Sequence, residues 1–125
     1  MSANGIFTVK YNVQVGDETE ERKLFFRYTF RSVKALRNHF NCKLSELEAK
    51  LKDPDIEDIE ALLYYGLIWK DRELTREEAE EWIDQASMDG KMQECIEAAS
   101  KALNFFFGMT EDDIKNAQKA TKAKK

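Results

Sequence analysis

The chain has 125 residues, a formal net charge of −4 and a sequence pI near 5.2. Its length fits one domain, which would bury roughly two thirds of the surface that the unfolded chain exposes. The acidic balance argues against a surface that follows nucleic-acid phosphates, so a protein partner is favoured and no nucleic-acid partner is expected.

The cysteines and the apolar runs exclude further classes. Cys42 and Cys95 lie far apart with no CxxC pair, so neither a disulfide framework nor a zinc site is indicated. No apolar run approaches the roughly 20 residues that span a bilayer. The start MSANGIF lacks the basic and apolar pattern of a signal peptide. We therefore expect a cytosolic protein with no membrane partner.

Residues 1–31 are predicted to form an antiparallel β-hairpin with one apolar face. Apolar residues alternate along two stretches separated by a break at residues 16–21: Phe7, Val9, Tyr11, Val13 and Val15, and then Leu24, Phe26, Tyr28 and Phe30. A two-stranded hairpin is marginal by itself. Its apolar face must therefore pack on helices from the rest of the chain.

Helix-start signals divide residues 32–108. Ser32 is predicted to cap a first helix, and Ser45 with Glu48 forms a capping-box pattern. Pro54 suits the first turn of the next helix. Thr75 with Glu78 forms a second capping box.

Apolar residues at helical spacing form three stripes, and Gly90 and Gly108 are predicted helix stops. The stripes are Ile56, Ile59, Leu62, Leu63, Gly66 and Leu67; Ala79, Trp82, Ile83 and Ala86; and Met92, Cys95, Ile96, Ala99, Ala102, Leu103 and Phe106. Residues 109–125 are predicted to form a polar helix that frays at its end. The sequence thus predicts one α+β domain over residues 1–125, a hairpin packed on about five to six helices.

No catalytic residue, metal ligand or cofactor site is predicted. His39 and Cys42 share one side of a helix, but a structural metal site usually needs four ligands. The acidic run over residues 53–60 is not an EF-hand, because its sixth and twelfth positions are Asp58 and Tyr64 rather than glycine and a carboxylate. Acids in the first turn of a helix are instead favoured by its dipole. Nucleotide-binding glycine motifs are absent from the sequence.

Several aromatic residues do not fit the apolar stripes. A helix that is apolar on several sides is either buried all round or bound to a partner. Core packing and a partner surface are both open for each residue, and aromatic residues and methionines such as Met88 and Met92 are favoured at interfaces. The candidate partner-binding residues are Tyr64, Tyr65, Trp69, Phe105, Phe107 and Met109.

The order of motifs over residues 9–86 resembles one known family. An aromatic strand, RKLFFRYTF, precedes RSVKALRNHF, then a D-x-E-x-hydrophobic helix ending ALLYYGLIW, and then LTREEAEEWID. This combination resembles the tail assembly chaperones of long-tailed bacteriophages and prophages. The resemblance implies a non-enzymatic protein of the host cytoplasm that is absent from the mature virion.

The resemblance also implies partners. Members of the family coat the tape measure protein, keep it soluble and release it as the major tail protein assembles around it. Some members self-associate. Many also have a longer form, made by ribosomal frameshifting, whose extension recruits the tail tube subunit. Lys124 and Lys125, at the end of this chain, are compatible with an A-rich slippery sequence.

Three other functions compete with this interpretation. The first is a small tail-completion or head–tail connector protein that stays in the virion. The second is an acidic regulator or nucleic-acid mimic, suggested by the carboxylates of residues 53–60 and 77–81 but opposed by the apolar residues between them. The third is an enzyme, which would require a constellation of titratable groups that the sequence does not suggest.

Overall fold

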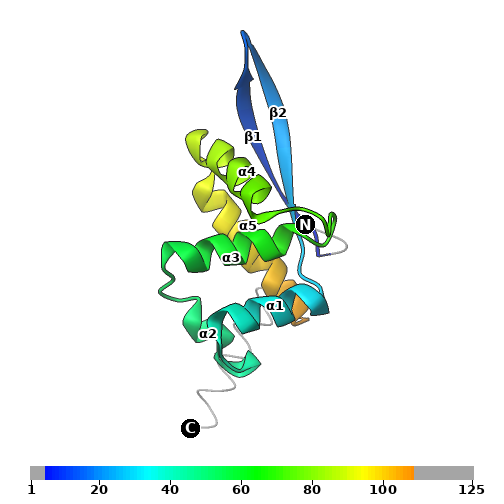
Figure 1. Cartoon of the computed structure of the whole chain (residues 1–125), viewed down its shortest axis with the longest axis vertical. Coiled ribbons are helices and arrows are strands. Elements are labelled where there is room, and N and C mark those ends of the chain that lie inside the picture. Colours follow the sequence, from blue (N-terminus) through cyan, green and yellow to red (C-terminus); the bar gives the residue numbers. More distant parts are fainter. Residues whose placement is uncertain (1–4, 109–125) are drawn as a thin grey trace.

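The computed structural model describes residues 5–108, so the polar helix predicted over residues 109–125, with Met109, lies outside the described part. Within this part, a hairpin of β1 (Phe7–Val15) and β2 (Glu18–Phe26) precedes five α-helices: α1 (Phe30–Phe40), α2 (Leu47–Lys50), α3 (Ile56–Leu67), α4 (Arg76–Met88) and α5 (Met92–Phe106). The helices gather around the base of the hairpin, whose tip extends beyond them (Figure 1). The predicted α+β class is confirmed.

The hairpin has a two-residue turn that fixes its register. Phe7 lies opposite Phe26, and Val15 lies opposite Glu18. Gly16 has a φ of 64°, the positive value that a tight hairpin turn needs at its first central position. The buried face contains Val9, Tyr11, Leu24 and Phe26, which join the helices in one hydrophobic core. The predicted apolar face of the hairpin is therefore confirmed along the half nearest the helices.

The second strand ends earlier than the alternating pattern predicted. Helix α1 begins at Phe30, which is 78% exposed, and its cap is Thr29 rather than Ser32. The Thr29 side chain accepts from the Ser32 N–H at 3.3 Å, and Ser32 Oγ accepts from the Thr29 N–H at 2.7 Å. This reciprocal box satisfies two backbone donors, and it explains why the helix starts before residue 32.

Two other helix starts also differ from the prediction. The Ser45–Glu48 box does not cap α2, because Glu46 instead accepts from the Lys43 N–H at 2.9 Å and the short α2 begins at Leu47. Pro54 precedes the cap of α3 rather than lying in its first turn. Asp55 is that cap, and its N–H donates to the Asp58 carboxylate at 3.0 Å. The Thr75–Glu78 box at α4 is confirmed.

Helix α3 lies at the centre of the fold and contacts β2, α1, α4 and α5. A Cβ added to Gly66 would lie 2.9 Å from the Tyr28 hydroxyl oxygen and 3.0 Å from Phe26 Cδ1, so the end of the hairpin reaches α3 because this residue is glycine. The Tyr28 hydroxyl donates to the Leu62 carbonyl, and burial raises its pKa well above 10.0. The predicted stripe is correct except at Ile56, which is 79% exposed at the first position of the helix.

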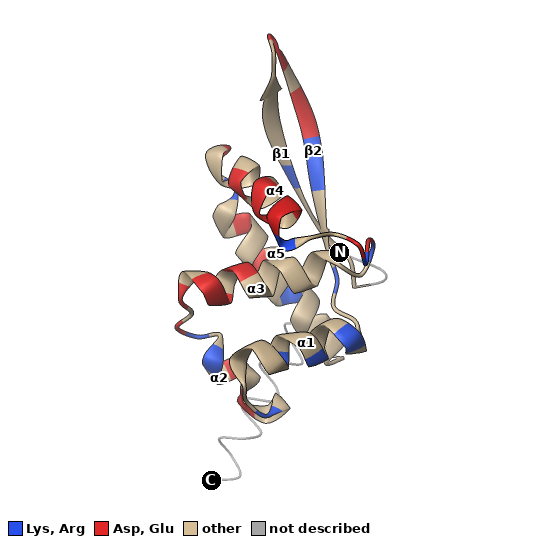
Figure 2. Ribbon diagram, viewed as in Figure 1, with Lys and Arg blue, Asp and Glu red and all other residues tan. Residues whose placement is uncertain are grey.

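Charge is unevenly distributed over the helices. Acidic residues cover α4 and the start of α3, whereas basic residues lie along α1 (Figure 2). Gly90 and Gly108 follow the C-caps of α4 and α5 and have φ values of 73° and 75°, as the predicted stops require. Among the described residues, no helix has the length and apolar character needed to cross a membrane.

Candidate partner-binding surface

Tyr64 and Tyr65 belong to α3, and polar contacts with Leu74 and Arg76 hold their rings against the start of α4. The Tyr64 hydroxyl donates to the Leu74 carbonyl at 3.0 Å. Arg76 donates to the Tyr65 hydroxyl at 3.2 Å, and its guanidinium carbon lies 4.8 Å and 5.3 Å from the centroids of the Tyr64 and Tyr65 rings. Both tyrosines are half-buried. Their rings and hydroxyl groups thus stabilise the connection between α3 and α4.

The charge of Arg76 is balanced at the same place. Arg76 Nη1 donates to Glu60 Oε1 at 3.0 Å. Burial opposes the charged form of Arg76, but its hydrogen bonds to Tyr65 and Glu60 outweigh this effect and raise its pKa. A hydrogen bond to Glu60 also raises the pKa of Glu80. The tyrosines therefore sit against a fixed cation, with acids along the neighbouring face of α4.

Trp69 connects the end of α3 to the edge of the hairpin. Its indole N–H donates to the Phe25 carbonyl at 2.9 Å, and Arg27 lies 5.6 Å from the centroid of its ring. Lys70 covers the Phe25 ring, with its amine 4.3 Å from the centroid. Trp69 is half-buried and supplies a donor to a strand edge. Together with the two tyrosines it forms what we call the tied aromatic group: Tyr64, Tyr65 and Trp69.

Phe105 and Phe107 differ from the tied aromatic group because they have no polar atoms and remain 42% and 39% exposed. The Phe105 ring lies edge-on to Phe7 at a centroid distance of 6.3 Å, and Phe107 lies edge-on to Phe106 at 5.3 Å. A Cβ added to Gly5 would lie 2.6 Å from Phe105 Cδ1. We call Phe105 and Phe107 the α5 aromatic end. It leaves apolar surface in water beside the base of the hairpin.

Three further apolar side chains, which are 78–88% exposed, are the most exposed large hydrophobic residues that the structure describes. Phe30 and Ile56 are the first residues of α1 and α3, and Met88, which is 88% exposed, is the last residue of α4. Periodicity placed Phe30 in a strand and Ile56 in the core. It could not identify them as exposed, because the first position of a helix need not face the interior even when it continues an apolar stripe.

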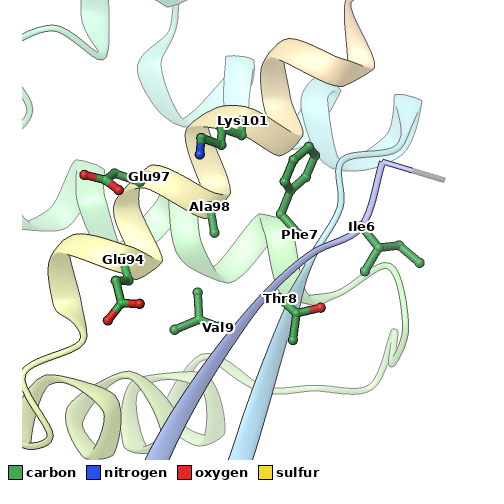
Figure 3. Close-up of a pocket in the computed structure, with 8 residues that line it drawn as sticks. All are labelled: Ile6, Phe7, Thr8, Val9, Glu94, Glu97, Ala98 and Lys101. Carbon is green, nitrogen blue, oxygen red and sulfur yellow. The ribbon is translucent and has the colours of Figure 1, made fainter. Parts of the chain in front are cut away.

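A groove runs between β1 and α5 (Figure 3). It has a volume of about 470 Å³. Ile6, Phe7, Thr8 and Val9 line its strand side, and Glu94, Glu97, Ala98 and Lys101 line its helix side. Glu94 lies near Val9 at one end of the groove, whereas Lys101 lies near Phe7 at the other (Figure 3). The groove thus has a largely apolar strand on one side. On its other side is a helix face that is acidic at one end of the groove and basic at the other.

His39, Asp58 and Cys95 form contacts within the fold. His39 Nε2 lies 3.1 Å from Asp58 Oδ1. The hydrogen bond from the Asp55 N–H, together with His39, lowers the pKa of Asp58. Cys95 is fully buried, and burial raises the pKa of its thiol to about 11, so it stays protonated. Within residues 5–108, His, Cys, Asp and Glu side chains do not gather in threes that could hold a metal ion.

No family model, curated protein or solved structure matches the chain.

Proposed function

We propose that this chain is a tail assembly chaperone of a long-tailed bacteriophage or prophage, which acts by binding rather than by catalysis. The observation that carries the proposal is the order of motifs over residues 9–86, from RKLFFRYTF through RSVKALRNHF and ALLYYGLIW to LTREEAEEWID. The proposed partner is the tape measure protein, which the chain keeps soluble in the host cytoplasm until tail tube subunits assemble around it.

The exposed side chains support such a role physically. A tape measure protein is long and helical, so before assembly its apolar residues would aggregate in water. The α5 aromatic end offers exposed phenylalanine rings that can cover such residues, and the acidic surface of α4 keeps charge in contact with water (Figure 2). Aromatic side chains are enriched at protein interfaces for this reason.

Each contact in this mechanism is weak, because the tube subunits must displace the chaperone. Many copies along one tape measure protein then supply the overall affinity through multivalency. Self-association would strengthen this effect. A longer, frameshifted form of the chain, in which an extension recruits the major tail protein, completes the proposal.

The test is co-expression of this chain with the tape measure protein from the same gene cluster. We expect the tape measure protein to move from the pellet into a soluble complex that co-purifies with this chain. A tape measure protein that stays insoluble contradicts the proposal. Mass spectrometry of purified particles is the second readout, because a stoichiometric amount of this chain in virions would identify a tail-completion or connector protein instead.

A further inference from the structure

The outer edge of β1 has backbone hydrogen-bonding groups that the hairpin does not use. The two-residue turn makes Val15 and Glu18 a hydrogen-bonded pair, so the even-numbered residues of β1 direct their N–H and C=O groups outward. The Asn12 N–H confirms this direction, because it donates to the Asp89 carboxylate at 2.8 Å. Among the described residues, the outward N–H and C=O groups of Thr8 and Lys10 have no hydrogen-bonding partner.

The two edges of the hairpin therefore differ. On β2, the outward carbonyl of Phe25 accepts from the Trp69 indole, and Lys70 covers the Phe25 ring. On β1, Thr8 lines the groove against α5 (Figure 3), and Lys10 follows it along the same strand edge. An open strand edge beside a groove is the arrangement that binds extended peptides by strand addition, in which the backbone gives affinity and the groove gives specificity.

We propose that this groove binds an extended segment of another protein as a third, antiparallel strand on β1, and that the segment contains a basic residue followed two positions later by an acidic one. A strand antiparallel to β1 runs in the direction of α5, from Glu94 toward Lys101 (Figure 3). Its residue opposite Val9 then lies beside Glu94 and Glu97, and its residue opposite Phe7 lies beside Lys101.

The spacing of the charges fits this register. Glu97 and Lys101 are four residues apart on a helix, which is about 6 Å along its axis. Two residues of a strand span about 7 Å. Side chains two apart on a strand also point to the same face, so the basic and the acidic residue both face α5. The helix side of the groove includes Ala98, which leaves room for the added strand.

A second copy of this chain fits the groove less well. Its β2 edge contains Glu20 and Glu21 before Arg22 and Lys23, so the acids come first. Glu20 and Arg22 share a face, so an antiparallel register that turns both toward α5 would place Glu20 beside Glu94 and Glu97 and Arg22 beside Lys101. Like charges at such distances are unfavourable. Strand β1 of a second copy has an open edge but contains no acidic residue, so it cannot supply the pair either. The groove therefore selects a segment of a different protein, and this inference stands on geometry, independently of the proposed chaperone function.

The test uses the full-length ¹⁵N-labelled chain and two synthetic peptides, acetyl-Ser-Thr-Lys-Val-Glu-Thr-Ser-amide and the same peptide with Lys and Glu exchanged. We expect the Lys-first peptide to shift the amide signals of Thr8 and Lys10 and to slow their hydrogen exchange. The Lys-first peptide should bind about tenfold more tightly than the Glu-first peptide, because its two charge contacts are favourable and those of the Glu-first peptide are unfavourable. Methylation of its valine nitrogen removes the donor opposite Thr8 and should abolish the shifts.

A charge-exchanged variant supplies the matched control. The exposed pair Glu97→Lys and Lys101→Glu leaves the net charge unchanged and should reverse the preference between the two peptides. Equal binding of both peptides, shifts at Lys23 on the other edge, or the absence of shifts with any peptide would overturn the proposal. Concentration-dependent shifts of Thr8 and Lys10 without peptide would assign the edge to a second copy and would also overturn it.

Discussion

The tied aromatic group and the α5 aromatic end contain the same class of side chain in two different situations. Tyr64 and Trp69 donate to the backbone carbonyls of Leu74 and Phe25, and Tyr65 accepts from Arg76. Phe105 and Phe107 have no polar atom with which to form such bonds and remain exposed. The comparison teaches that an aromatic ring outside the core stripe stabilises the fold when its polar atom finds a partner, and is free for binding when it has none.

The largest expected effect is at Trp69. Trp69→Ala removes the hydrogen bond to Phe25 and the packing of a half-buried ring, so it should lower the free energy of unfolding by roughly 2–4 kcal/mol. Trp69→Phe, which keeps most of the ring but loses the donor, should cost about 1 kcal/mol. Urea denaturation followed by circular dichroism measures both. If Trp69→Ala were as stable as the unsubstituted chain, the tied aromatic group would not stabilise the fold.

Tyr64→Phe should have the next largest effect of a single substitution. It removes one hydroxyl and leaves the Leu74 carbonyl without this donor, which should lower the free energy of unfolding by about 1 kcal/mol. Phe107→Tyr is the matched control, since it adds a hydroxyl to an exposed ring and should leave stability within about 0.5 kcal/mol. Equal losses in the two variants would remove the distinction between tied and free rings.

The double variant Phe105→Ser and Phe107→Ser should cost less stability than Trp69→Ala. Both rings are partly exposed, at 42% and 39%, and each has one aromatic contact, so we expect a loss of about 1–2 kcal/mol. The measurement is again urea denaturation, with an unchanged far-UV spectrum as the check on folding. A loss as large as that of Trp69→Ala would show that the α5 aromatic end is part of the core.

The smallest expected effect is a pH dependence at the start of α3. The pKa of Asp58 is lowered in the folded chain, so its contribution to stability is present above its usual value of 3.8 and is lost as the pH falls through the folded value. Asp58→Ala should therefore cost up to about 1 kcal/mol near neutral pH, and less in acid. Urea denaturation near neutral pH and in acid measures the stability that Asp58→Ala loses under each condition. An equal loss at the two pH values would exclude the charge of Asp58 as the cause.

Local patterns predicted most of the elements because they depend on neighbouring residues. Strand alternation, the Thr75–Glu78 box and the glycine stops were all correct. The errors arose where two local signals were equivalent. The alternating pattern of β2 continues through Phe30, and both Thr29 and Ser32 can cap a helix, so only the structure distinguishes them.

The candidate surface could be predicted less completely. From periodicity alone, Tyr64, Trp69 and Phe107 are equivalent candidates, since each lies off an apolar stripe. Their difference depends on contacts that are distant in sequence: Leu74 is ten residues from Tyr64, and Phe25 is 44 residues from Trp69. The groove between β1 and α5 likewise depends on residues that are distant in sequence. No periodicity brings residues 6–9 together with residues 94–101.

The most direct test of the account is to co-express the tape measure protein with the double variant Phe105→Ser and Phe107→Ser, with Tyr64→Phe as the control. We expect the control to keep the tape measure protein in the soluble complex, because its ring surface is unchanged. The double variant should remain folded but leave most of the tape measure protein in the pellet. A double variant that still solubilised its partner as well as the control would contradict the assignment of the α5 aromatic end as the binding surface.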